Sequence, residues 1–311
     1  MDHKIAIIIP CYNEGLTITA TVLGLHATVP EAEIFVYDNN SSDDTIELAR
    51  AAGAHVFVER NQGKGNVVRR MFSDIEADVY LLIDGDNTYD AGSAPELLRL
   101  VMEEGMDFVN GARRESSEKA YRAGHKFGNW MLTTMIRKIF GAEFSDMLSG
   151  LKCFSRRYVK SFPALSRGFE IETELTTHAL ELRMPCYEIT TPYGERPEGS
   201  VSKLRTYRDG FRILLTILKL VKEERPLQLF SCIGGVLFLA AMLFMIPVLQ
   251  TYLATGLVPR LPTAILAISL TGLGALSIVM AIIMDSVVTM RREMKRIAYL
   301  QIPMFKAGKG R

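Results

Sequence analysis

Two long stretches without a charged residue lie in the last third of the chain, and they limit its fold more than any other feature. The first is LFSCIGGVLFLAAMLFMIPVL, residues 229–249, and the second is LPTAILAISLTGLGALSIVMAIIM, residues 261–284. Each is longer than the roughly 20 apolar residues with which an α-helix crosses a hydrocarbon core of ~30 Å, whereas apolar core helices of soluble proteins are usually shorter. We therefore predict two transmembrane helices, at about 229–249 and 262–286, rather than two buried core helices.

Basic residues on both sides of this region predict its orientation. KLVKEERP precedes the first stretch, RREMKR follows the second, and the connection QTYLATGLVPR carries only Arg260. The positive-inside rule then puts both ends of the hairpin in the cytoplasm. The N-terminal region is also expected there, because the apolar run in MDHKIAIIIP is too short for a signal peptide. We predict an order of four parts: a cytoplasmic domain (1–206), a juxtamembrane amphipathic helix (207–228), a transmembrane hairpin (229–290) and a basic cytoplasmic tail (291–311).

Two further segments mix basic and large apolar side chains, as helices at a membrane interface do. YRDGFRILLTILKLVKEER, residues 207–225, leads directly into the first apolar stretch, which favours the interface. KAYRAGHKFGNWMLTTMIRKIFG, residues 119–141, fits the interface and packing against a sheet equally well.

The first hundred residues alternate between short apolar runs and helical patterns. The runs KIAIIIP, EIFVYD, HVFVER and DVYLLID are predicted strands, and the segments between them have the spacing and caps of helices. Apolar strands alternating with helices predict an α/β fold with a mainly parallel sheet. In such sheets the ligand binds at the carboxyl ends of the strands. Here those ends read PCYNE, DNNSSDD, RNQGKG and DGD, so we expect a crevice of the nucleotide-binding type.

The charges and the metal-binding residue types exclude other classes. The chain has 36 lysines and arginines against 35 aspartates and glutamates, so no nucleic acid is expected as a partner. The four cysteines form no CxxC pair and the five histidines are scattered, which argues against a zinc site or a disulfide framework. RNQGKGN is neither a P-loop nor a dinucleotide fingerprint. Lys64 is either an anion-binding residue at a helix start or part of a solvated turn.

Two acids separated by one glycine follow the fourth strand. Asp84 and Asp86 repel each other unless a cation or a proton lies between them. Mg²⁺, or Mn²⁺ in its place, takes one or two carboxylates together with substrate phosphates. We therefore predict that Asp84 and Asp86 bind such a metal next to a diphosphate. The alternative is a polar loop whose acids cap a helix.

Six motifs taken in order resemble a known family. PCYNE, DNNSSDDT, NQGKG and DGD are similar to the motifs of family-2 inverting glycosyltransferases of the GT-A fold. DMLSGLKCFSRR and YGERPEGSVSKLRTYRDG resemble those of its polyprenyl-phosphate glycosyltransferases, the dolichol-phosphate mannose synthase group. The similarity covers roughly residues 4–215 and implies a GT-A nucleotide-sugar-binding domain followed by the interfacial helix and the hairpin.

The resemblance also implies roles for individual residues. The nucleotide sugar would be bound by residues at the strand ends: Pro10, Tyr12, Glu14, Asp38, Asn39, Lys64, Asp84 and Asp86. The acceptor phosphate would be held by Arg113 or Arg114 together with Ser149, Arg196, Ser202 and Lys203. Catalysis would depend on Asp86, Asp146, Arg196 and Lys203. Two departures stand out: Asn39 replaces the second acid of the usual Asp-Asp-Gly-Ser, and Thr88 stands where glutamine often follows the metal acids.

The expected reaction needs no strong base, because a polyprenyl phosphate is already a nucleophilic anion. Catalysis is then positioning and neutralisation of the leaving diphosphate, with the metal as Lewis acid. The predicted function is inverting transfer of a hexose or N-acetylhexosamine from a UDP- or GDP-linked sugar to polyprenyl phosphate. The product would be a lipid-linked sugar donor for cell-envelope glycans or glycoproteins. The expected partners are the nucleotide sugar, the lipid and the membrane, and a homo-oligomer is left open.

Two other functions compete with this one. A processive polysaccharide synthase would carry Gln-x-x-Arg-Trp, whereas the single tryptophan, Trp130, follows HKFGN. A non-catalytic nucleotide-sugar sensor would not need both the paired acids and the phosphate-binding segments. Glu170, Glu172 and Glu174 also alternate in GFEIETEL. They are either solvated acids or, on a strand, one face from which Glu172 or Glu174 orients the arginines or the sugar.

Overall fold

The computed structural model describes residues 3–115, 134, 144–168, 170–194, 222 and 225–304. The chain divides into two compact units, one formed by Met1–Ile213 with Met294–Arg311 and the other by Leu214–Glu293. The predicted amphipathic segments at 119–141 and 207–225 lie almost wholly outside the described residues.

A seven-stranded sheet forms the centre of the first unit, in the order β3-β2-β1-β4-β6-β5-β7. Its strands are β1 Ile5–Cys11, β2 Glu33–Asp38, β3 His55–Val58, β4 Val79–Leu82, β5 Phe108–Glu115, β6 Lys152–Ser155 and β7 Cys186–Tyr193. The first four strands pair in parallel, as do β5 and β7, whereas β6 runs antiparallel to both β4 and β5. The predicted mainly parallel sheet is confirmed, and β6 makes it a mixed sheet.

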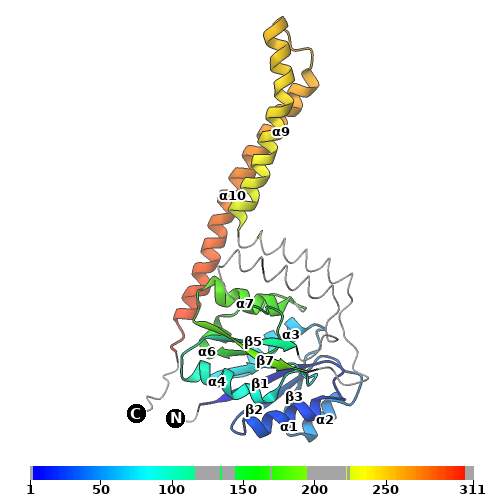
Figure 1. Cartoon of the computed structure of the whole chain (residues 1–311), viewed down its shortest axis with the longest axis vertical. Helices are drawn as coiled ribbons and strands as arrows, with labels where there is room; N and C mark the ends of the chain where they lie inside the picture. Colours follow the sequence, from blue (N-terminus) through cyan, green and yellow to red (C-terminus); the bar gives the residue numbers. More distant parts are fainter. Residues whose placement is uncertain are drawn as a thin grey trace. The chain divides into compact units, whose positions relative to one another are not determined.

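Helices cover both faces of this sheet (Figure 1). They are α1 Ile18–Thr28, α2 Thr45–Ala51, α3 Lys64–Asp74, the 3-10 helix η1 Ala91–Ser93, α4 Ala94–Met102, α6 Arg156–Ser161 and α7 Ile171–Glu181. The helices α1, α2 and α4 pack with alternate residues of β1 into one apolar core. On the other face, aromatic rings of α3, α6, β4 and β6 pack together: Phe72 meets Tyr80 and Phe154 edge to face, and Phe154 stacks on Tyr158. Strands buried on both faces read as continuous apolar runs, which explains IAIII in β1.

The strand register brings the carboxyl ends of β1, β2 and β3 to one edge. Cys11 pairs with Asp38 and Asp38 with Val58, so the polar segments that follow these strands begin side by side. The backbone continues this alignment, because Asn39 donates to the carbonyl of Cys11 and Glu59 to that of Asp38. The polar segments that the sequence predicts as a ligand site therefore do lie next to one another, at the carboxyl ends of these three strands.

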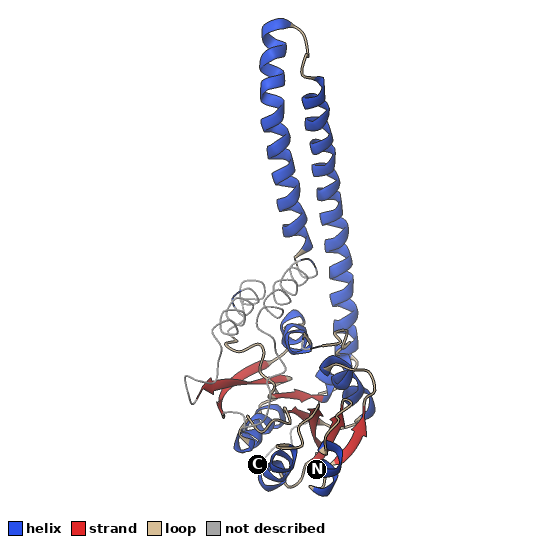
Figure 2. Ribbon diagram, turned by 90° about the vertical axis from the view of Figure 1, so that its right-hand side faces the viewer, coloured by secondary structure: helices blue, strands red, loops and turns tan. Residues whose placement is uncertain are grey.

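The second unit contains two antiparallel helices that lie side by side, α9 Pro226–Thr255 and α10 Leu261–Leu300 (Figure 2). The last turns of α10, from Met294 onward, belong to the first unit. Both are long and apolar enough to cross a membrane. Apart from Pro226 at the start of α9, their buried residues recur every seven positions: Gly234, Ala241 and Val248 in α9, and Ala267, Gly274, Ala281 and Val288 in α10. Small residues at such positions let two membrane helices approach closely. Gly234 and Gly274 meet there, since a Cβ on Gly274 would lie 3.2 Å from the carbonyl oxygen of Gly234.

The helix α10 extends beyond the predicted span, because RREMKRIAYL consists largely of good helix formers. Its last turns contact other residues of the first unit. Lys295 pairs with Glu181 at 2.6 Å, and the Tyr299 hydroxyl donates to the Asp107 carboxylate at 2.7 Å. The predicted basic tail thus begins as a helix.

Candidate active site

The paired acids follow β4 in a tight turn. Asp86 is buried, and it accepts hydrogen bonds from the backbone N–H of Thr88 at 3.2 Å and from its hydroxyl at 2.6 Å. Thr88 therefore orients Asp86. Gly85 between the acids admits no side chain, because a Cβ there would lie 2.7 Å from the Cys11 sulfur. Asp84 is more accessible, with 30% of its side chain exposed.

The described residues contain no cluster of three or more histidine, cysteine, aspartate or glutamate side chains that could hold a metal. The two carboxylates of Asp84 and Asp86 nevertheless suit Mg²⁺ or Mn²⁺. These hard cations take oxygen ligands, and Mg²⁺ keeps several waters while it binds one or two carboxylates and substrate phosphates.

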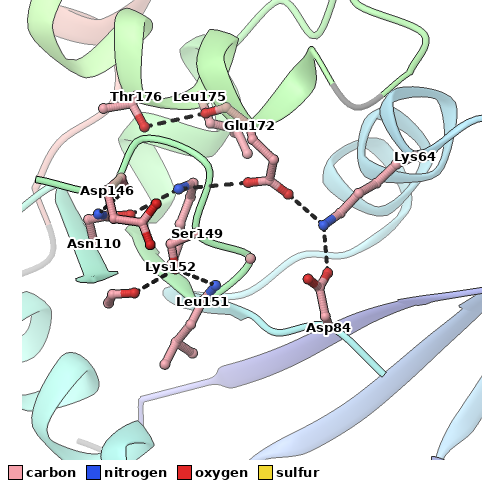
Figure 3. A network of polar contacts seen from close by, with 12 residues as sticks. Lys64, Asp84, Asn110, Asp146, Ser149, Leu151, Lys152, Glu172, Leu175 and Thr176 are labelled. Atoms are coloured by element: carbon pink, nitrogen blue, oxygen red, sulfur yellow. Dashed lines mark hydrogen bonds and ion pairs between the residues drawn. The ribbon is translucent and has the colours of Figure 1, made fainter. Parts of the chain in front are cut away.

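Lys64, the first residue of α3, points into the site instead of the solvent (Figure 3). Its ammonium group lies 2.5 Å from Asp84 Oδ1 and 2.5 Å from Glu172 Oε1. Burial alone would lower the pKa of Lys64, but the charges of Asp84 and Glu172 outweigh it and raise the pKa above its usual range. Lys64 is therefore charged. It is not part of a solvated turn, which was one of the two alternatives from the sequence, because its side chain is only 11% exposed.

The glycines that flank Lys64 serve packing. A Cβ on Gly63 or Gly65 would lie 2.2 Å from the carbonyl oxygens of Arg167 and Ser166, respectively. The N–H of Gly65 already donates to the Arg167 carbonyl at 3.1 Å. An anion at this helix start would consequently meet the Lys64 side chain and not the Gly65 N–H.

The predicted base-binding residues lie at the ends of β1 and β2. The Asp38 carboxylate accepts from the Ser41 N–H through Oδ2 at 3.0 Å, while its buried Oδ1 has no hydrogen-bond partner among the described residues. Tyr12 is 38% exposed beside this edge, and Pro10 and Glu14 flank it in sequence.

Asn39 has a different task from the acid that it replaces. Its amide donates to the carbonyls of Glu59 at 2.8 Å and Asn61 at 2.9 Å, and its oxygen accepts from the Gly63 N–H at 2.7 Å. The side chain thereby ties β2 to the loop before α3. It has little hydrogen-bonding capacity left for a ligand.

Among the residues predicted to hold the acceptor, Arg113 of β5 and Asp146 form a forked ion pair. The Arg113 Nε and Nη2 atoms lie 2.6 and 2.8 Å from the carboxylate oxygens, and the Arg113 backbone N–H also donates to Asp146. Burial would raise the pKa of Asp146, but hydrogen bonding to Arg113 and its charge lower it below the usual value. Arg114, the next residue on the strand, is exposed, because successive side chains of a strand point to opposite faces.

The segment that contains Asp146 packs directly against Asp84. Gly150 is pressed against the Asp84 carboxylate, since a Cβ on Gly150 would lie 2.0 Å from Asp84 Oδ2. Ser149 is fully buried, and its hydroxyl donates to the Gly111 carbonyl at 2.5 Å. The Tyr89 hydroxyl accepts from the Gly150 N–H at 2.6 Å. The donor and acceptor halves predicted from separate motifs are therefore neighbours, and Ser149 fixes the segment between them.

Two residues of this network, Asn110 and Lys152, were not predicted as site residues. A third, Glu172, was suggested only as one of two acids that orient the arginines or the sugar. The Lys152 ammonium is fully buried, donates to Asn110 Oδ1 at 2.9 Å and lies 3.7 Å from Glu172 Oε2. Burial lowers the pKa of Lys152 below its usual value. Asn110 in turn donates to the Asp146 carbonyl at 2.8 Å. Figure 3 shows the resulting series of alternating charges from Asp84 through Lys64 and Glu172 to Lys152.

The alternating glutamates lie at the start of a helix and not on a strand face, and Glu172 is not a solvated acid, because its side chain is 5% exposed. Glu170 is the N-cap of α7, Glu172 is buried and binds lysines, and Glu174 accepts from the backbone N–H groups of Leu165 and Ser166 at 2.9 and 2.8 Å. The predicted Arg196, Ser202 and Lys203 lie outside the described residues.

Comparison with known proteins gives consistent matches. The family described as Glycosyl transferase family 2 matches residues 6–162. Glycosyltransferase AglJ of Haloferax volcanii is 36% identical over 232 residues, 74% of this chain and 76% of AglJ. The undecaprenyl-phosphate 4-deoxy-4-formamido-L-arabinose transferase of Yersinia pestis is 27% identical over 266 residues, 81% of this chain and 78% of that protein.

Among solved structures, glucosyl-3-phosphoglycerate synthase of Mycobacterium tuberculosis has a similar fold. In its complex with Mn²⁺, UDP-glucose and phosphoglyceric acid it has a TM-score of 0.57 and 22% identity, and the match covers 70% of this chain and 79% of that chain. At this identity the likeness shows a shared fold.

Proposed function

The chain belongs to glycosyl transferase family 2, and on this basis we propose that it transfers a hexose or an N-acetylhexosamine from a nucleotide sugar to a polyprenyl phosphate with inversion. The glycosyltransferase activity and the GT-A fold expected from the sequence are confirmed by the family and by the structural likeness. The contact of Gly150 with Asp84 supports the finer proposal, because the segment that contains Asp146, the partner of Arg113, packs against one of the two candidate metal carboxylates.

The donor diphosphate is proposed to bind at Asp84, Asp86 and Lys64. A divalent metal held by the two carboxylates would act as Lewis acid on the leaving diphosphate. Thr88 keeps the Asp86 carboxylate in one orientation, and Lys64 supplies a positive charge at the start of α3. These groups bind and orient the donor, which suits a reaction that depends on neutralising a leaving anion.

Uridine is the nucleoside that we propose. Uracil offers a single N–H donor at N3, whereas guanine offers two adjacent donors that need two acceptors. Asp38 uses one carboxylate oxygen for the Ser41 N–H, which leaves the buried Oδ1 as one acceptor. Calorimetric titration should therefore detect UDP and not GDP in the presence of Mn²⁺. Asp38→Asn should abolish the signal, because an amide cannot accept from both N–H groups; tight GDP binding would contradict the assignment.

Arg113 is proposed to bind the acceptor phosphate, with Asp146 as its positioning partner. A guanidinium binds phosphate by forked hydrogen bonds, and Arg113 is already held in one direction by Asp146. The lowered pKa of Asp146 keeps this carboxylate ionised near neutral pH, which fits orientation of Arg113. The acceptor phosphate needs no base, so direct displacement at the anomeric carbon gives inversion. Arg196, Ser202 and Lys203 remain further candidates for this phosphate.

A donor and acceptor screen tests this proposal. The purified full chain is incubated with Mn²⁺, a panel of UDP- and GDP-sugars, and either undecaprenyl or dolichyl phosphate, and the lipid-linked sugar is detected by mass spectrometry. We expect product with one UDP-sugar and none with the unphosphorylated polyprenol. Product that grows as a polymer would support the processive synthase. Nucleotide binding without turnover on any lipid would support the sensor.

The membrane arrangement is also part of the proposal: 1–206 as cytoplasmic catalytic domain, 207–228 as juxtamembrane helix, 229–290 as the hairpin and 291–311 as cytoplasmic tail. A single cysteine at the exposed Thr255 is introduced after replacement of the four native cysteines. An impermeant thiol reagent should label it in intact cells. Labelling only after the cytoplasmic face is opened would contradict this orientation.

A further inference from the structure

We propose that Lys64 takes the place of the divalent cation beside Asp84 when no nucleotide is bound, and that Glu172 holds the Lys64 ammonium group when cation and diphosphate arrive. The inference rests on the proposed function, because it takes a metal-bound nucleoside diphosphate as the ligand. It assigns to Glu172 the positioning of a lysine, whereas the sequence suggested Glu172 only as a residue that orients the arginines or the sugar.

The position of Lys64 is fixed at its base and at its tip. Gly63 and Gly65 are pressed against the carbonyls of residues 166–167, which sets the start of α3. The ammonium group lies 2.5 Å from one oxygen of Asp84 and 2.5 Å from one oxygen of Glu172, and only 11% of the side chain is exposed. Lys64 therefore neutralises Asp84 directly, as a bound cation would.

The two carboxylates that hold Lys64 differ in their surroundings. The Glu172 side chain is 5% exposed and also faces the fully buried Lys152, so this one carboxylate lies next to two buried ammonium groups. The Asp84 side chain is 30% exposed and lies two residues from the second candidate metal ligand, Asp86. Removing Glu172 from the lysines would leave buried charge uncompensated, which is strongly unfavourable. The bond to Asp84 is thus the one that exchanges, and the bond to Glu172 is retained.

This arrangement couples the metal to the nucleotide. A cation that binds Asp84 without nucleotide must compete with Lys64 and tolerate a like charge nearby, so it binds weakly. A cation that arrives with a diphosphate brings an anion to which the Lys64 ammonium can turn while it stays on Glu172. Metal and UDP should therefore each strengthen the binding of the other, as linkage requires.

Mn²⁺ titration followed by electron paramagnetic resonance tests the competition directly, with no need for turnover. Lys64→Met removes the ammonium group and keeps an unbranched side chain. We expect this variant to bind Mn²⁺ alone at least tenfold more tightly than the wild-type chain, and to bind UDP with saturating Mn²⁺ at least tenfold more weakly. Lys4→Met is the matched control, because Lys4 is half exposed and pairs only loosely with Glu33 at 3.6 Å. It should change neither affinity by more than twofold.

Glu172→Gln provides a second variant that keeps Lys64. Without the Glu172 charge, Lys64 is left to Asp84, and Mn²⁺ alone should bind at least tenfold more weakly than to the wild-type chain. Lys64→Gln, which removes the charge but keeps a polar side chain between the two carboxylates, takes the place of Lys64→Met if that variant does not fold, with the same expected tightening of Mn²⁺ binding. Unchanged or weaker Mn²⁺ binding in Lys64→Met, or unchanged binding in Glu172→Gln, would overturn the inference. If the wild-type chain binds no Mn²⁺ even with UDP, the proposed function itself fails.

Discussion

Replacing Arg157 by methionine tests how strongly the catalytic unit depends on one buried carboxylate outside the candidate site. Asp107 precedes β5 and is fully buried. The Nε and Nη2 atoms of Arg157 donate to it at 2.5 and 2.6 Å, and the hydroxyls of Ser155 and Tyr299 donate at 2.6 and 2.7 Å. These contacts join the start of β5 to the end of β6 and to the last turn of α10. Methionine keeps much of the Arg157 stem but removes the charge.

The expected loss follows from what remains around Asp107. Removing one partner of a buried ion pair costs about 3–5 kcal/mol, because the other charge stays uncompensated. The Ser155 and Tyr299 hydroxyls still donate to Asp107, so we expect the lower end, about 3 kcal/mol. A domain of this size loses roughly 2–4 °C in Tm for each kcal/mol. The Tm of Arg157→Met should therefore fall by about 6–12 °C.

Thermal unfolding of the purified full chain in detergent, followed by circular dichroism, measures this shift. Arg99→Met is the matched control, because Arg99 also forks a carboxylate, that of Glu96, but both side chains are 40–50% exposed. A surface pair contributes ~0–1 kcal/mol, so this Tm should fall by less than about 4 °C. Transfer by folded Arg157→Met at 20 °C should stay within twofold of wild type. Equal Tm shifts in the two variants would refute the reasoning.

Transfer should be lost in Asp86→Ala and reversibly lost in EDTA, and full activity in EDTA with metal-free substrates would exclude the two-carboxylate metal site. Gly274→Leu should separate α9 from α10, because even a Cβ lies 3.2 Å from the Gly234 carbonyl. Cysteine cross-linking between the helices should fall in that variant and persist in Gly272→Leu, whose position has open space. Burial, and to a lesser extent Lys295, lowers the pKa of His178 to about 3. The unfolded chain therefore binds a proton below about pH 6.5 that the folded chain does not, and stability should fall with decreasing pH by up to about 1.4 kcal/mol per unit. His178→Gln should flatten this dependence in pH-dependent urea unfolding.

The half of the sheet that can be read from the sequence is the half made by local repetition. Each of the first four strands is a short apolar run next to a helical pattern. The spacing of apolar residues that identifies such a run can be seen within a short window of the sequence. The other half is set by pairing between distant segments. Strand β6 runs antiparallel between β4 and β5, and nothing in KCFS specifies this place. The GFEIETEL segment was ambiguous for a related reason: its acids fit a strand face, but Glu170 stands at the N-cap position of a helix that buries Glu172.

The candidate site divides in the same way. Asp38, Asp84 and Asp86 could be predicted because parallel strands end at a common edge, so position along the strand suffices. Arg113 could not be separated from Arg114 until the direction of β5 was known. Lys152 gave no signal, because a fully buried lysine is unexpected on a strand and its partners Asn110 and Glu172 are distant in sequence.

Lys64 points into the candidate site for a reason that the sequence motif does not contain. A lysine between glycines at a helix start suggested an anion held by backbone N–H groups. In the structure these glycines allow residues 166–167 to press on the start of α3. The Glu174 carboxylate holds that segment by accepting a hydrogen bond from the backbone N–H of Ser166. The direction of the Lys64 side chain is therefore set by residues about a hundred positions later in the chain. The short motif around Lys64 and the acids of α7 act together. The motif contributes the Lys64 ammonium group, and Glu172 and Glu174 of α7 determine its position.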